Sequence, residues 1–212
     1  MAALPLTLHA QPSAWRVYST RKADSRFASF RDKVWERDNY TCQYCGFQAM
    51  LYQDVVNKDN DYRNSKLDNL VTACCFCSQC LFIESINYND FGGGTIIHLP
   101  QMSQSELNGL CHVLFCAIAN ATSYRADAQA LYRSLKFRAQ LVEQTLGEGM
   151  SNPARLGQVL IDAPIKEKAV LMQKVFSELR LLPSRTKFSA QINHWAQAAM
   201  EEVHPEEGNF LA

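Results

Sequence analysis

The sequence predicts an α+β fold in which a cysteine-rich module over residues 1–100 precedes a mostly helical region over residues 101–212 that packs on it. Two observations support this prediction. Cysteines at Cys-x-x-Cys spacing occur at 42–45 and again within 74–80, on either side of a polar segment rich in turn-forming residues. After residue 100, apolar residues recur at the three- and four-residue spacing of amphipathic helices. The length of 212 residues suits one large domain or two small ones.

An amphipathic helix is expected over residues 24–38, ahead of the first cysteines. Asp24 or Ser25 is a suitable cap for its start. The apolar residues that recur at helical spacing are Phe27, Phe30, Val34 and Trp35.

Short strands and loops are expected in the rest of the module. Residues 49–56 have a strand-like composition, and residues 57–69 are polar and predict a loop. Apolar residues return at 70–82. A flexible connection follows at 87–94, without the Lys-Ser/Thr pair of a phosphate-binding loop. Residues 94–100 predict one further strand.

The region after residue 100 predicts several helices. Ser103 and Glu106 match a capping box, and the apolar stripe after them is Leu107, Leu110, Cys111, Leu114 and Ile118. A second helix is expected from about residue 123 to 146, ending at Gly147, with inward-facing Leu131, Leu135, Val142 and Leu146. Asn152-Pro153 predicts a further helix start. Later helices are expected over 166–180 and 187–203, separated by Leu182-Pro183.

Charge and targeting patterns reduce the number of functional classes that fit the chain. The formal net charge is zero, whereas proteins that bind duplex nucleic acid usually carry a surplus of cations. Cations do gather near the start, and acids such as Glu206 near the end; we interpret the former as a solvated helix face, with a nucleic-acid or acidic-partner footprint as the alternative. The first residues do not resemble a signal peptide, so we expect a cytoplasmic protein with reduced thiols.

Eight cysteines in a reducing compartment predict metal ligands or buried core rather than disulfides. Cys42 and Cys45 supply two sulfurs, and Cys74, Cys77 and Cys80 repeat the same spacing. Two such pairs can bind one tetrahedral Zn²⁺ and join two distant chain segments. The alternatives are a redox dithiol and plain core cysteines; core packing is the expectation for Cys111 and Cys116. Spacing alone leaves open whether Cys80 replaces Cys74 or Cys77.

Residues 30–80 resemble an HNH endonuclease domain. The resemblance is carried by "FRDKVWERDNYTCQYCG" and "LDNLVTACCFC". It implies a degenerate HNH-like (ββα-metal) module in which one structural Zn²⁺ is held by Cys42, Cys45, Cys74 and Cys77.

The catalytic part of the HNH pattern is missing. The family uses a histidine as general base, an asparagine that orients it, and a second histidine with a carboxylate to hold a divalent cation. The matching positions here read Asp54-Val55, Asn69 and Ser78, and no histidine lies between Cys45 and Cys80. Because loss of a general base typically costs about 10²–10⁴ in rate, we predict a protein that is not an enzyme.

The whole chain is also similar to a family of components of the Dot/Icm type IVB secretion system. Segments such as "VTACCFCSQCLF", "LNGLCHVLFCA" and "RLLPSRTKF" carry this similarity. It implies a protein that binds the C-terminal extension of the coupling ATPase DotL, in a coupling complex with DotM and adaptor proteins. The protein would lie in the cytoplasm, at the inner membrane face through its partners, with no nucleic-acid partner.

Three functional hypotheses follow. The leading one is a non-catalytic interaction module, to whose surface Tyr40, Tyr44, Phe47, Tyr52 and Tyr62 could contribute. The second is a divergent nuclease or nucleic-acid binder that uses Asp54, Asn69 and His98. The third is a redox switch in which Cys75 or Cys80 exchanges with a metal ligand.

Overall fold

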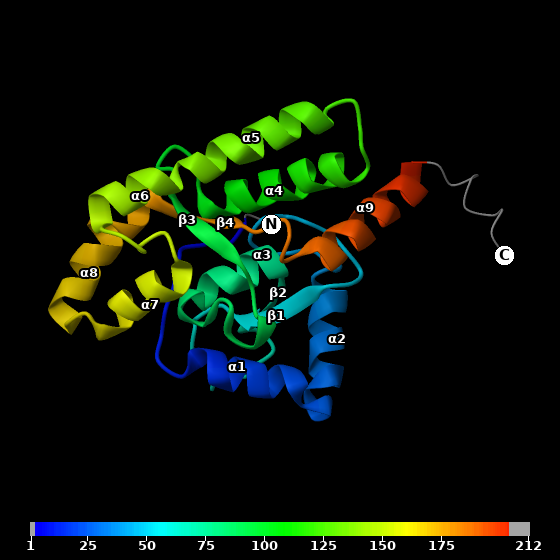
Figure 1. Ribbon diagram of the computed structural model, residues 1–212. Coiled ribbons are helices and arrows are strands. Elements are labelled where there is room, and N and C mark those ends of the chain that lie inside the picture. The colour runs from blue at the N-terminus through cyan, green and yellow to red at the C-terminus, as the bar shows by residue number, and fades with distance from the viewer. Residues whose placement is uncertain (1–2, 204–212) are drawn as a thin grey trace.

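The computed structural model describes residues 3–203 and has an α+β architecture, as the sequence predicts (Figure 1). Among these residues the strands form two antiparallel pairs, β1 with β2 and β3 with β4. The strands are β1 (Gln53–Asn57), β2 (Leu70–Cys74), β3 (Gly94–His98) and β4 (Leu179–Pro183). The helices are α1 (Ala14–Ala23), α2 (Ala28–Arg37), α3 (Cys75–Ser78), α4 (Gln104–Ala119), α5 (Arg125–Phe137), α6 (Ala139–Leu146), α7 (Pro153–Asp162), α8 (Ile165–Lys174) and α9 (Ser189–Val203).

The N-terminal helices pack around the first sheet. The expected helix over 24–38 is confirmed as a short 3-10 turn followed by α2, and the Asp24 side chain caps the turn by accepting from the Arg26 N–H. Val34 is buried against Val55 and Leu70, but Phe30 is 45% exposed. Of the apolar residues that recur at helical spacing, Phe27 and Trp35 pack with Val34, whereas Phe30 lies largely in solvent.

The first sheet pairs β1 with β2 from Gln53 opposite Cys74 to Asn57 opposite Leu70. The loop expected over 57–69 is confirmed, and side chains inside it hold it together. The Asn57 amide donates to the carbonyls of Asp61 and Asn64 at 2.8 and 2.7 Å. This loop therefore has a fixed shape at the far end of the hairpin from the cysteines.

The second sheet joins distant parts of the chain. The strand expected at 94–100 is confirmed as β3, and it pairs with β4, where Thr95 lies opposite Leu182. The helix expected over 166–180 ends at Lys174, and Leu182-Pro183 is part of a strand rather than a helix break. The expectation was wrong because pairing with β3 makes the apolar run at 179–182 a strand, and the local spacing of residues does not reveal that partner.

Both outer edges of the second sheet are covered. On β3, the Ile96 N–H donates to the Ser151 carbonyl at 2.8 Å. On β4, the Gln104 side chain accepts from the Leu181 N–H and donates to the Leu181 carbonyl, at 2.8 and 2.9 Å. These contacts leave little free backbone for a further strand to pair with.

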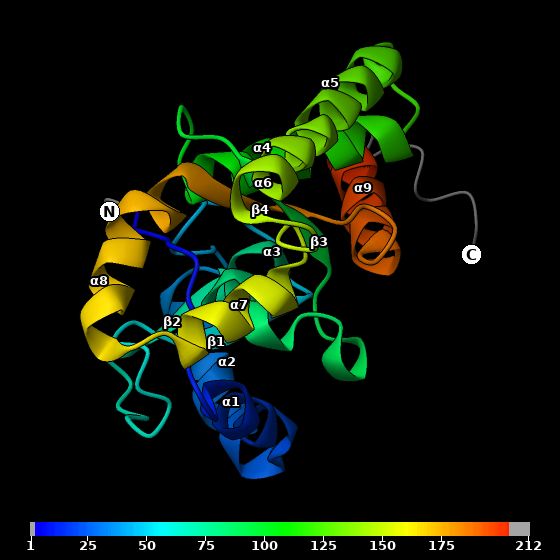
Figure 2. The same cartoon turned by 60° about the vertical axis from the view of Figure 1, so that its left-hand side comes forward.

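Helix α4 lies between α5, α9 and the second sheet (Figures 1 and 2). The Ser103–Glu106 capping box is confirmed. The single helix expected over 123–146 is divided into α5 and α6 at Arg138, and Leu131 is 42% exposed rather than inward-facing. Gly147, with a φ of 106°, ends α6, and the Asn152 side chain caps α7, both as predicted.

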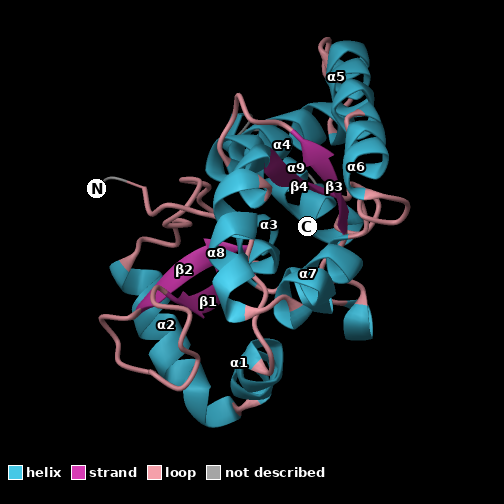
Figure 3. Cartoon of the chain, turned by 90° about the vertical axis from the view of Figure 1, so that its left-hand side faces the viewer, coloured by secondary structure: helices cyan, strands magenta, loops and turns pink. Residues whose placement is uncertain are grey.

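One hydrophobic core contains residues from both halves of the chain, from Leu6 to Trp195. Its buried apolar residues include Tyr18 and Phe82 from the first hundred positions and Phe115 and Leu181 from the rest. Figures 1 and 3 show the first sheet lying beside α1, α2 and α3, while the second sheet lies beside α4 and α6. Within residues 3–203, none of the helices has the length and apolar character needed to cross a bilayer.

Candidate metal centre

The first cysteine pair lies in a tight turn between α2 and β1. The Cys42 N–H donates to the Phe47 carbonyl at 2.8 Å, and the Gly46 N–H donates to the Cys42 carbonyl at 3.0 Å. Gly46 has a φ of 77°, which glycine adopts without steric cost. The Gln43 N–H donates to the Thr72 carbonyl at 2.9 Å. This last bond fastens the cysteine turn to β2.

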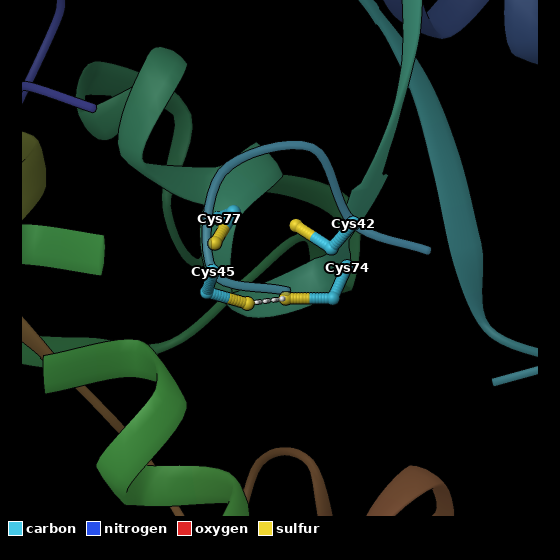
Figure 4. A group of neighbouring side chains, drawn as sticks. All are labelled: Cys42, Cys45, Cys74 and Cys77. Atoms are coloured by element: carbon cyan, nitrogen blue, oxygen red, sulfur yellow. Dashed lines mark hydrogen bonds between the residues drawn. The ribbon is translucent and has the colours of Figure 1, made fainter. Parts of the chain in front are cut away.

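The second pair lies where β2 passes into α3. Cys74 is the last residue of β2 and precedes the helix with extended backbone angles (φ −69°, ψ 160°). Cys77 lies in the single turn of α3, and both residues are fully buried. The change from strand to helix places both thiols on the side that faces the cysteine turn (Figure 4).

The sulfur atoms of Cys42, Cys45, Cys74 and Cys77 all lie within 4.8 Å of one another (Figure 4). We call these residues the four-cysteine cluster. The Cys45 and Cys74 sulfurs are 3.7 Å apart, and sulfurs bound to one tetrahedral zinc at about 2.3 Å are about 3.8 Å apart. All four cysteines are free thiols. The cluster therefore fits a tetrahedral metal ion held by sulfur.

Burial affects how these thiols ionise. Desolvation raises the pKa of Cys74 and the pKa of Cys77 well above the ordinary thiol value. A metal dication would stabilise the thiolates in their place, so metal binding and proton release occur together. Such a site would contribute structural stability rather than an open coordination position.

The other cysteines lie outside the cluster. Cys80, which the spacing left as an alternative ligand, donates its thiol to the Phe76 carbonyl at 3.2 Å, and burial raises the pKa of Cys80 to about 12. Cys111 is buried core on α4, as expected, and Cys116 is half-buried. Cys75, also half-buried, is not part of the cluster either.

Two residues of α4 that the sequence analysis did not select contact the cluster. His112 Nε2 lies 3.3 Å from Cys74 Sγ, and the Asn108 amide donates to Cys77 Sγ at 3.2 Å. Burial lowers the pKa of His112 to about 3, which favours a neutral ring whose Nε2–H can donate to sulfur. The sequence does contain a signal for these contacts: Asn108 and His112 are two polar residues, one helical turn apart, on the buried side of an otherwise apolar helix.

The positions that match HNH catalytic residues form an internal contact. Ser78 Oγ donates to Asp54 Oδ2 at 2.6 Å, and Lys22 Nζ pairs with Asp54 Oδ1 at 2.5 Å. Asp54 is buried, and its carboxylate raises the pKa of Lys22. Asp54 is thus a buried carboxylate with both oxygens bonded inside the chain.

The other residues of the nuclease hypothesis, Asn69 and His98, make contacts within the chain away from Asp54. The Asn69 amide donates to Asp59 Oδ1 and to the Asn64 carbonyl, both at 2.9 Å, so it shapes the loop before β2. His98 is at the end of β3, where its Nε2 lies 3.2 Å from Glu178 Oε2. His204 and Glu206 lie outside the described residues.

These features define a class: an α+β protein in which a buried four-cysteine cluster joins a β-hairpin to helices. No protein-family model matches the chain. The chain is 57% identical, over 198 residues that cover 93% of it and 92% of the relative, to "Type 4 apparatus protein DotN" of Legionella pneumophila subsp. pneumophila. The chain therefore belongs to the DotN family.

Proposed function

We propose that this protein is a non-catalytic, zinc-stabilised interaction component of a bacterial type IV secretion system. The observation that carries the proposal is the 57% identity to a relative named as a type 4 apparatus protein, which extends over nearly the whole of both chains. At this identity the fold and the buried surfaces are shared, and a shared place in the apparatus is the natural inference.

The proposed metal is one structural Zn²⁺ bound by Cys42, Cys45, Cys74 and Cys77. The sulfur spacing and the burial of the cluster support it, as does the preference of four thiolates for zinc among common cellular metals. Elemental analysis of purified protein should give about one zinc per chain. Fully folded protein that contains no metal would contradict the proposal.

An HNH-like origin of the metal module is supported by the order of its elements. A two-stranded hairpin, β1 and β2, leads directly into α3, and the cysteines lie before the hairpin and at its end. This order of elements supports the ββα-metal arrangement that the resemblance implies.

The absence of nuclease activity is supported by the internal bonds of the site. Asp54 accepts from Ser78 and pairs with Lys22. Two cations of the N-terminal helices are engaged within the chain: Arg21 donates to the Val55 carbonyl at 3.0 Å, and Arg37 to the Leu70 carbonyl at 2.6 Å. Purified protein should therefore leave plasmid and single-stranded DNA intact with Mg²⁺ or Mn²⁺. Cleavage that disappears in Asp54→Ala would establish the divergent nuclease instead.

The proposed partner is the C-terminal extension of the coupling ATPase DotL, in a complex with DotM and adaptor proteins at the cytoplasmic face of the inner membrane. Of the aromatic residues first considered for the binding surface, Tyr44 and Tyr62 are buried, and Tyr52 is exposed beside α9. Purified protein and the isolated DotL extension should form a stoichiometric complex in calorimetry and size-exclusion chromatography. Failure to associate under conditions in which both are folded would refute this partner.

A further inference from the structure

Helix α4 contributes two side chains to the surroundings of the four-cysteine cluster. His112 Nε2 is 3.3 Å from Cys74 Sγ, and Asn108 Nδ2 is 3.2 Å from Cys77 Sγ. The two residues are four positions apart, so they lie on the same face of α4. They reach the two sulfurs of the β2–α3 junction, and the contacting residues are 38 and 31 positions apart in the sequence.

The His112 ring is held in place by aromatic stacking. It stacks on Phe47 at a centroid distance of 3.6 Å and an interplanar angle of 6°, and on Phe76 at 4.3 Å and 20°. Trp195 of α9 contacts the ring edge-on at 5.1 Å. Phe47 follows the first cysteine pair and Phe76 lies within the second. Both cysteine segments therefore fix the orientation of His112 toward sulfur.

Asn108 is fixed by a chain of hydrogen bonds. Its amide also donates to the Phe76 carbonyl at 3.2 Å, and its carbonyl oxygen accepts from Gln104 Nε2 at 2.9 Å. The Gln104 side chain also bonds to both backbone groups of Leu181 in β4. A continuous path of hydrogen bonds thus runs from the second sheet, through α4, to Cys77.

The charge of a metal-loaded cluster explains why such donors are needed. Four thiolates around one dication carry a net charge of −2, and three of these four cysteines are buried. A buried charge is costly unless hydrogen-bond donors stabilise it. An N–H group directed at a thiolate supplies this stabilisation and orients the ligand, as outer-shell partners do at other metal sites.

We propose that α4 is a functional part of the metal centre, in which His112 and Asn108 are positioning residues that determine how tightly the cluster holds its metal. This inference rests on the proposed metal site. It also implies that metal binding is coupled to the docking of α4, which contacts α5, α9 and β4. The metal thereby stabilises the helical region as well as the hairpin that contains its ligands.

The test uses substitutions that keep shape but remove the donor: His112→Phe, which preserves a stacking ring, and Asn108→Leu. Each zinc-loaded variant is mixed with excess chromogenic chelator, and the rate of zinc release is measured beside circular dichroism of the same sample. We expect release at least tenfold faster than from wild type, since loss of outer-shell partners typically weakens metal binding by about 10- to 100-fold. His112→Gln, which keeps an N–H donor, should release zinc at an intermediate rate.

Matched controls separate loss of a donor from general destabilisation. Asn120, at the end of the same helix, donates to the sulfur of Cys116, which is outside the cluster, at 3.6 Å. His194, on α9, contacts Tyr52 edge-on. Asn120→Leu and His194→Phe should release zinc at the wild-type rate.

A second measurement reports the thiolates directly. In the Co²⁺-substituted protein, the sulfur-to-cobalt charge-transfer band should shift in His112→Phe and in Asn108→Leu but not in the two controls. Hydrogen exchange should also show that α4 amides lose protection when zinc is removed from wild type.

Each outcome bears on a distinct claim. Wild-type protein that binds neither Zn²⁺ nor Co²⁺ would refute the metal site itself and with it the zinc part of the proposed function. If wild type binds metal, and His112→Phe and Asn108→Leu retain it at the wild-type rate with an unshifted band, the inference about α4 is overturned. Should one variant fail to fold, the other together with His112→Gln decides the question.

Discussion

Ser78 Oγ donates a hydrogen bond to Asp54 Oδ2 at 2.6 Å, which links the helix after the hairpin to its first strand. The other carboxylate oxygen of Asp54 pairs with Lys22 of α1. Both oxygens are therefore satisfied inside the chain. At two of the positions where the HNH resemblance implies catalytic groups, Asp54 and Ser78, this protein has a contact that joins α1, β1 and α3.

Lys22→Met should destabilise the protein, because it leaves the buried Asp54 carboxylate without its cation. The Lys22 side chain is 58% exposed, so we expect a loss of about 1–3 kcal/mol in the free energy of unfolding, less than for a fully buried pair. Urea denaturation provides the measurement, with Lys33→Met on the exposed face of α2 as control. The double variant Lys22→Met, Asp54→Asn should be more stable than the sum of the single changes; simple additivity would argue against this pairing.

Cys42→Ser and Cys77→Ser should each lose most of the bound zinc and unfold at a lower temperature, because three sulfurs leave the metal incompletely coordinated. Cys116→Ser is the matched control, since Cys116 lies outside the four-cysteine cluster. Zinc content and thermal denaturation are measured on the same samples. Equal zinc content in Cys77→Ser and Cys116→Ser would show that the metal is bound elsewhere.

Substitution by alanine should change the free energy of unfolding in opposite directions at two helical glycines. A Cβ at Gly157 of α7 would lie 2.6 Å from the Glu84 backbone nitrogen, whereas a Cβ at Gly109 of α4 would meet only the Cys45 carbonyl, at 3.8 Å. Gly157→Ala should therefore cost about 1–3 kcal/mol through overpacking. Gly109→Ala should be stabilising by up to about 1 kcal/mol because alanine favours the helix. Chemical denaturation checks both, and a stable Gly157→Ala would show that α7 packs less closely.

Glu84 should make the protein less stable as the pH rises. Both of its carboxylate oxygens are buried without a hydrogen-bond partner, and desolvation raises the pKa of Glu84 to about 7. The unfolded chain loses this proton near the ordinary glutamate pKa of about 4.3. At pH values between about 4.3 and 7, the folded state therefore holds a proton that the unfolded state has lost. The stability that the protonated group contributes is therefore present below about pH 4 and is lost as the pH rises through 7.

Glu84→Gln should remove this dependence and stabilise the protein above pH 7 by roughly 2–3 kcal/mol. Urea denaturation at pH 5.5 and pH 8 compares it with Glu167→Gln, a change at an exposed position of α8. A pH dependence in Glu84→Gln equal to that of wild type would assign the effect to other groups.

The local sequence was sufficient to predict where an element begins or ends when that boundary depends on the element's own residues. The capping box before α4, the Asn152 cap of α7 and the stop at Gly147 are short-range hydrogen-bonding or backbone effects, and all three were predicted. It was insufficient for β4, because an apolar run becomes a strand only where a partner strand is available. Leu131 was misplaced because the buried side of α5 contains Ala128 and Leu135, and Tyr132 rather than Leu131 packs against the core between them.

The sequence by itself determined the two cysteine pairs, since ligand spacing is a local property of the chain. The family resemblance then indicated which four cysteines form the cluster. Only the tertiary structure decided what surrounds them. The contacts of His112 and Asn108 with sulfur, and of Lys22 and Ser78 with Asp54, join residues 24 to 38 positions apart. Such contacts depend on how helices pack across the core, and helical spacing specifies a buried face without specifying what that face meets.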